Sequence, residues 1–250
     1  MSVKSEHSTR LLVRASLLEL WRRQDLWVLM MLMGMYALIA LGARATGEME
    51  PQTATFMLNL GLTLSAIFSQ LLTLLIAVRQ IPVEMEQRTL YPLLAKPLTR
   101  DALLLGKWLA AGLCGVLSAL MFQGLVFLVT PVMEPFHAST LLQHQLLLPL
   151  SLFAVAGMGI HLSLWLPKGL ALCSGALLVF AAEPLVRAFQ GSLPPVLLLP
   201  RFGALNLVTR YTDGIAALAA PQFILMAGYI LLWNVLWTVL SRERFRRMPL

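Results

Sequence analysis

Hydrophobic residues gather in six long runs along the chain, and short polar or charged stretches separate these runs. Each run is close to the roughly 20 apolar residues with which an α-helix crosses the hydrocarbon layer of a membrane. We therefore predict an all-α membrane protein with six transmembrane helices, over residues 26–43, 53–78, 99–129, 146–166, 169–189 and 222–240. An even number of spans places both chain termini on the same side of the membrane.

Two segments outside these spans also have helical patterns. In residues 9–24, Leu11, Ala15 and Leu18 recur at helical spacing, and four arginines occupy other positions of the segment. This pattern is typical of an amphipathic helix that lies in the membrane surface. Residues 191–221, between spans five and six, are too apolar for a free linker and predict short helices on the outer face.

Composition agrees with a membrane location. Of the 250 residues, 58% are hydrophobic and 12% are charged, whereas soluble domains have roughly 45–50% and 25%. Because nearly all residues fall in or beside spans, the chain has room for a single transmembrane domain over residues 1–250 and for no separate soluble domain.

The positive net charge of +7 follows the predicted topology. Fifteen of the 19 lysines and arginines fall in the two termini, in residues 79–107 or between spans four and five, and four fall on the opposite side. Cytoplasmic segments of membrane proteins carry such an excess, so we expect both termini in the cytoplasm. We predict an integral protein of a bacterial inner membrane that contacts lipids and binds no nucleic acid.

Residues 79–107 are the only long charged stretch between two apolar runs, so they should lie in water between spans two and three. Glu84 and Arg88 have the four-residue spacing of a favourable ion pair on a helix. An apolar face of the same segment consists of Leu90, Leu93 and Leu94. Thr99 and Asp101 are typical of a helix start. We predict a cytoplasmic coupling loop that contains a short coupling helix.

This stretch resembles the cytoplasmic loop of type-2 ABC exporter permeases. The shared pattern has two acids separated by one residue, Thr-Leu, a leucine-rich turn, a proline, a hydroxyl residue, an arginine and a Gly-Lys pair. Arg88 departs from the pattern, because a glycine is common at its position. The resemblance implies that the loop couples the spans to an ATPase through Glu84, Glu86, Arg88, Thr89, Leu90, Leu93, Leu94, Pro97 and Arg100.

The resemblance also implies a function and an assembly. The chain would be the permease subunit of an ABC exporter, forming the translocation pathway as a homodimer with two copies of an ABC ATPase that binds ATP and Mg²⁺. The sequence has no G-x-x-x-x-G-K-[ST], H-E-x-x-H or G-x-S-x-G motif. We therefore expect no enzyme activity, cofactor, catalytic residue or metal ligand in this chain.

Two other functions stay open, a secondary transporter and a non-transporting scaffold of an assembly or maturation complex. An ion-coupled carrier ordinarily has acids at mid-membrane depth, and none stands clearly there, which disfavours the carrier but not the scaffold. The substrate and the direction of transport also stay open, because the polar residues in the spans are few and scattered. They include Asn59, Gln70, Gln123 and Asn234.

Three further features each have two interpretations. Glu183 and Arg187, four residues apart in span five, can form a structural salt bridge or belong to a substrate path. The methionines of span one can be apolar filler or soft ligands for Cu(I), although no Cys or His accompanies them. Small residues at four-residue spacing can pack spans within one chain or between two chains. They are Gly61, Ser65 and Ser69 in span two, and Ala111, Gly115 and Ala119 in span three.

Overall fold

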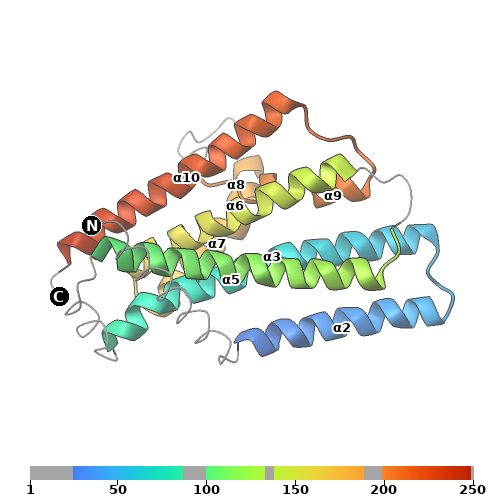
Figure 1. Ribbon diagram of the computed structural model, residues 1–250, viewed down its shortest axis with the longest axis horizontal. Coiled ribbons are helices and arrows are strands. Elements are labelled where there is room, and N and C mark those ends of the chain that lie inside the picture. Colours follow the sequence, from blue (N-terminus) through green and yellow to red (C-terminus); the bar gives the residue numbers. More distant parts are fainter. Residues whose placement is uncertain (1–24, 87–99, 133–137, 189–198, 249–250) are drawn as a thin grey trace, which may run out of the picture.

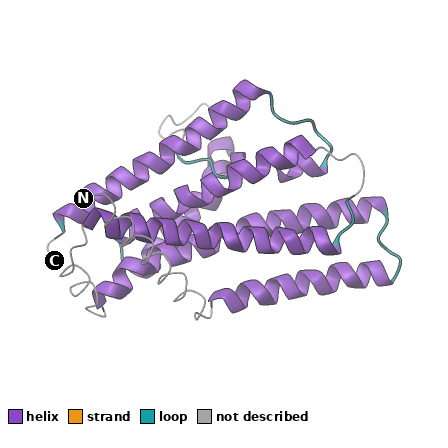
Figure 2. Cartoon of the chain, in the orientation of Figure 1, coloured by secondary structure: helices purple, strands orange, loops and turns teal. Residues whose placement is uncertain are grey.

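The computed structural model describes residues 25–86, 100–132, 138–188 and 199–248. Within these ranges the chain forms helices joined by turns and loops, without a strand, so the predicted all-α class is confirmed (Figure 2). The elements are α2 (Asp25–Ala45), α3 (Pro51–Glu86), α5 (Arg100–Val129), α6 (Ala138–Ser163), α7 (Lys168–Phe180), α8 (Ala182–Ala188), the 3-10 turn η2 (Gly203–Leu205), α9 (Val208–Thr212) and α10 (Ala220–Arg247).

Five of the described helices, α2, α3, α5, α6 and α10, are long and apolar enough to cross a membrane. Helices α7 and α8 together form a sixth candidate span, with a bend of 51° between them. The bend lies beside Pro184, whose nitrogen has no hydrogen to donate to the carbonyl of Phe180 four residues earlier. The region predicted as the fifth span, residues 169–189, is therefore a broken helix.

Helix α3 extends beyond the range that hydropathy predicts for the second span. It has 36 residues, against the predicted 53–78, and it continues through Pro82 to Glu86. At 1.5 Å per residue it measures about 54 Å, well beyond a hydrocarbon core of about 30 Å. Helix α6 likewise begins at Ala138 rather than at residue 146. Hydropathy alone misses these ends because a helix can continue into water after its apolar run stops.

The predicted coupling loop is correspondingly shorter than residues 79–107. Residues 79–86 belong to α3, and residues 100–107 belong to α5. The segment between these helices and the amphipathic helix predicted over residues 9–24 lie outside the described residues.

Helices α3 and α6 form the centre of the bundle, and α2 and α10 lie at opposite edges (Figure 1). In the most apolar window of each span, 61% of α3 and 67% of α6 is buried, against 17% of α2 and 11% of α10. The two edge helices therefore expose most of their apolar side chains to the surroundings of the chain, which in a membrane are lipid or other subunits.

Small residues let α3 and α5 approach closely within this chain. A Cβ atom added to Gly115 of α5 would lie 1.9 Å from the Thr73 hydroxyl of α3, so only glycine fits there. The Ser65 hydroxyl of α3 donates a hydrogen bond of 3.3 Å to the carbonyl of Ala119 in α5. Of the two interpretations of the small-residue strips, the structure favours packing between spans of one chain.

The polypeptide between spans five and six is fastened to the end of the bundle where α3 and α6 begin. Asn59 of α3 donates a hydrogen bond of 3.0 Å to the hydroxyl of Thr212 in α9. Gln143 of α6 donates to the carbonyl of Leu218 at 2.9 Å and accepts from its backbone N–H at 2.8 Å. Burial raises the pKa of the Tyr211 phenol in α9 to about 12.

Candidate functional site

The structure describes the two ends of the predicted coupling loop. Glu84 and Glu86 lie in the last turn of α3, and Arg100 is the first residue of α5. The other residues predicted for ATPase coupling lie outside the described residues. They are Arg88, Thr89, Leu90, Leu93, Leu94 and Pro97.

The first loop end is tied to α5 by a buried ion pair. The ammonium group of Lys107, two turns inside α5, donates a hydrogen bond to the carboxylate of Glu84. The side chains of Lys107 and Glu84 are only 7% and 16% exposed. A buried charge without a partner is destabilising by several kcal/mol, so each of these two groups makes the burial of the other tolerable.

The same end of α3 also contacts α7. The ammonium group of Lys168, the first residue of α7, lies 2.5 Å from a carboxylate oxygen of Glu86. These side chains are 35% and 65% exposed. Water screens such a pair, so it contributes about 0–1 kcal/mol and positions the helix ends without holding them firmly.

The second loop end is tied to the C-terminus of α10. One guanidinium nitrogen of Arg100 donates hydrogen bonds to the carbonyls of Phe245, Arg246 and Met248, at 3.4, 3.1 and 3.1 Å. The last carbonyls of a helix have no partner within the helix and carry partial negative charge, so a cation is favourable there. Arg100 therefore caps α10 from the first turn of α5.

Asp101 completes this contact. Its carboxylate accepts hydrogen bonds from Arg242 at 2.7 Å and from Arg246 at 2.5 and 3.1 Å. The four-residue spacing of these arginines places both on one face of α10. Asp101, expected only as an acid at a helix start, is thus also the counter-ion of α10. We call the contacts of Arg100 and Asp101 with α10 the α10 clasp.

Sequence reasoning placed Glu84, Glu86 and Arg100 near the loop but missed their partners. Lys107 carried a signal, because a lysine next to apolar residues of a span needs a counter-charge. In the sequence, Lys168 and the α10 arginines indicated only which side of the membrane their segments lie on. These contacts join residues up to 148 positions apart, so no local pattern could reveal them.

A comparison with known protein families assigns the chain to one of them. A family model described as ABC-2 family transporter protein matches residues 4–250. The chain belongs to this family. Because the match covers nearly the whole chain, the ABC-2 assignment does not depend on the loop motif alone. The protein is a membrane permease component of an ABC transporter, and its family implies association with an ABC ATPase. No curated protein matches the chain.

Two other features of this ABC-2 permease gave ambiguous patterns in the sequence. On α8, Arg187 donates a hydrogen bond of 3.0 Å to Glu183, so the salt bridge is formed, with side chains 72% and 18% exposed. On α2, Met31 is 79% exposed on the outside of the bundle. Among the described residues, no group of three or more His, Cys, Asp or Glu side chains could hold a metal ion.

Proposed function

We propose that this permease couples a translocation pathway to ATP hydrolysis by a separate ATPase, and that residues 79–107 transmit the coupling. The observation that carries the proposal is the linkage at both loop ends. One end reaches α5 and α7 through Glu84 and Glu86, and the other reaches α10 through Arg100. A displacement of the loop would therefore act on several spans at once.

The nine predicted coupling residues then divide into two groups. Glu84 and Arg100 would pass movement to the spans, since their charged groups contact α5 and α10. Glu86 is more exposed, and together with the residues between α3 and α5 it faces the ATPase. The apolar face of Leu90, Leu93 and Leu94 would supply affinity in a groove, and flanking charges would set the register.

The working assembly in this proposal is a homodimer of permease chains with two ATPase copies in a bacterial inner membrane, with cytoplasmic termini. The exposed apolar faces of α2 and α10 support it, because they offer surface for lipid and for a second permease chain. ATP and Mg²⁺ would bind to the ATPase. Its closure would push on the loop and shift the spans between inward-open and outward-open states, in the direction of export.

Two variants test separate steps of this proposal in the copurified complex. Leu93→Asp with Leu94→Asp should release the ATPase, because each buried leucine contributes roughly 1.5–3 kcal/mol and a buried unpaired acid costs more. Arg100→Gln should retain the ATPase but lower substrate-stimulated ATP turnover, because the α10 clasp is weakened.

Arg247→Gln is the matched control for the clasp. Arg247 pairs with Glu243 within α10, at 2.6 Å, and makes no described contact with α5. Its loss should leave turnover unchanged. A double Asp variant that copurifies with undiminished ATPase and shows normal turnover would refute the coupling role of the loop and favour a scaffold.

A further inference from the structure

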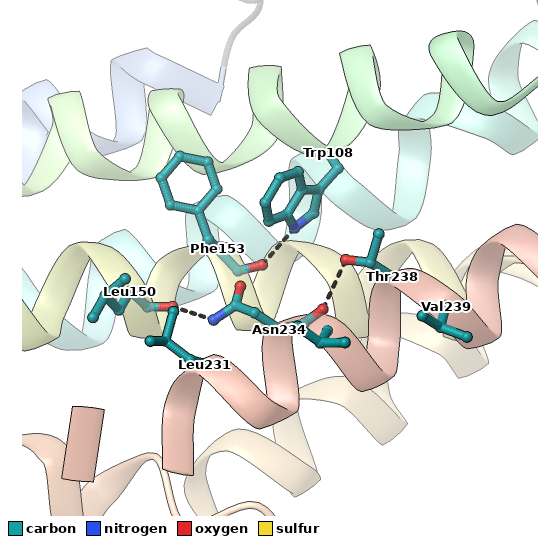
Figure 3. Close-up of a pocket in the computed structure, with 8 residues that line it drawn as sticks. Trp108, Leu150, Phe153, Leu231, Asn234, Thr238 and Val239 are labelled. Carbon is teal, nitrogen blue, oxygen red and sulfur yellow. Dashed lines mark hydrogen bonds between the residues drawn. The ribbon is translucent and has the colours of Figure 1, made fainter. Parts of the chain in front are cut away.

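A cavity of about 380 Å³ lies among α5, α6 and α10, and no residue of the ion pairs at the loop ends lines it (Figure 3). This volume lies in the range of small-molecule sites, about 300–1,000 Å³. Its walls are aromatic and aliphatic apart from Asn234 and Thr238 of α10. The apolar part includes Trp108, Phe153, Leu231 and Val235. The cavity is therefore an apolar space with two polar groups on one wall.

Asn234 lies near the middle of α10 and is only 8% exposed. Its amide nitrogen donates hydrogen bonds to the carbonyls of Leu150 and Ile230, at 3.0 and 2.9 Å. Carbonyls only accept hydrogen bonds, so these two contacts fix which end of the amide is nitrogen. The amide oxygen, drawn on the side of Trp108 and Phe153 in Figure 3, is buried and has no hydrogen-bond partner among the described residues, so a ligand reaches it only if side chains of the wall move apart.

The other polar groups in the wall already donate their hydrogens in hydrogen bonds within the protein. The Thr238 hydroxyl donates to the backbone carbonyl of Asn234 at 2.7 Å, and the Trp108 indole N–H donates to the carbonyl of Phe153 at 2.9 Å. The wall thus offers acceptors, and it contains no charged residue. An anion would find neither a donor nor a positive charge, whereas a neutral molecule with a hydroxyl would satisfy the Asn234 oxygen.

We propose that this cavity binds a neutral, apolar molecule of the bilayer that bears a hydroxyl group, which donates a hydrogen bond to the amide oxygen of Asn234. The ligand enters from the lipid, because Leu231, Val235 and Val239 are 49%, 63% and 57% exposed on the outer side of α10. Plain hydrocarbon chains would fill the space but leave the amide oxygen unsatisfied. The proposed binding does not depend on coupling to the ATPase.

A second apolar cavity provides an internal control. It has about 450 Å³ and lies among α2, α3 and α7, lined by residues such as Val28, Phe68 and Cys173. No side chain in its wall carries an oxygen or nitrogen atom. A hydroxyl should therefore give no advantage for binding there.

Photolabelling of the full chain in phosphatidylcholine nanodiscs tests the proposal. The probes are a benzyl alcohol that carries a photoreactive trifluoromethyl-diazirine group and the methyl ether of the same compound, which has no donor. The alcohol should label the peptide around Asn234 roughly two- to tenfold more than the ether, as expected for one hydrogen bond. In the second cavity both probes should label equally.

Three variants complete the test. Asn234→Leu should reduce labelling by the alcohol to the level of the ether, and Val235→Trp should reduce both by filling the cavity. Leu232→Trp, at a residue that is 64% exposed and lies outside the wall, should change neither.

Equal labelling of the unmodified chain by alcohol and ether would overturn the proposal without any variant. The proposal would also be overturned if the alcohol labelled the unmodified chain no more than it labels Val235→Trp, since the cavity would then be closed by a second copy or by other chains.

Discussion

Helices at the end of the bundle that bears the predicted coupling loop are joined by charged groups, whereas those at the opposite end are joined by neutral hydrogen bonds. At the loop end, Glu84 and Glu86 bind lysines of α5 and α7, and the α10 clasp joins α5 to α10. At the opposite end, the Tyr36 hydroxyl shares a hydrogen bond of 2.7 Å with Thr130, and Asn59 donates to Thr212.

This difference gives the two ends of the bundle different sensitivities to an approaching charge. Charged groups interact over distance and respond to the charges of a docking partner. Neutral hydrogen bonds are directional and depend little on salt or on a neighbouring charge. In the proposed coupling, the loop end is thus suited to respond to the ATPase, and the opposite end is suited to hold α2, α3, α5 and α9 together.

The largest expected effect is at the buried pair of the loop end. Lys107→Met should lower the free energy of unfolding by about 3–5 kcal/mol, because it leaves the Glu84 carboxylate buried without this ammonium group. Thermal or denaturant unfolding of the purified protein in detergent measures the loss. Adding Glu84→Gln to Lys107→Met should restore much of the stability. A loss below about 1 kcal/mol for the single variant would mean that water reaches the pair.

An intermediate effect is expected at the neutral end. Tyr36→Phe removes one hydroxyl, which contacts Thr130 and also donates to the carbonyl of Met57 at 3.0 Å. The free energy of unfolding should fall by about 1 kcal/mol, equally at low and high salt, because no charge is involved. A loss that shrinks with added salt would contradict the assignment of this end as neutral.

The smallest effect is expected at the exposed pair of the loop end. Glu86→Gln should lower the free energy of unfolding by less than about 1 kcal/mol, because water screens its contact with Lys168. The difference should vanish in about 1 M salt, where the screening length is about 3 Å. A larger loss that persists in salt would show that Glu86 is a structural anchor like Glu84.

The sequence by itself determined the membrane class and the family. A bilayer leaves few solutions for a long apolar run, because every backbone polar group must be satisfied within the segment, and a helix does this. The apolar runs around Leu62, Val116 and Leu236 therefore predict helices without tertiary information. The order of acids, prolines and basic residues from Glu84 to Lys107 likewise indicated an ABC permease, which the ABC-2 family match supports.

Only the tertiary structure decided how these helices meet. The apolar run of the second span ends near Val78, yet α3 continues to Glu86. The acids of its last turn, Glu84 and Glu86, form ion pairs with lysines of other helices. Asn234 was one of several scattered polar residues until α5, α6 and α10 enclosed a cavity around it. Local patterns report the preference of each segment for lipid or water, whereas ion pairs and cavities depend on which distant segments become neighbours in space.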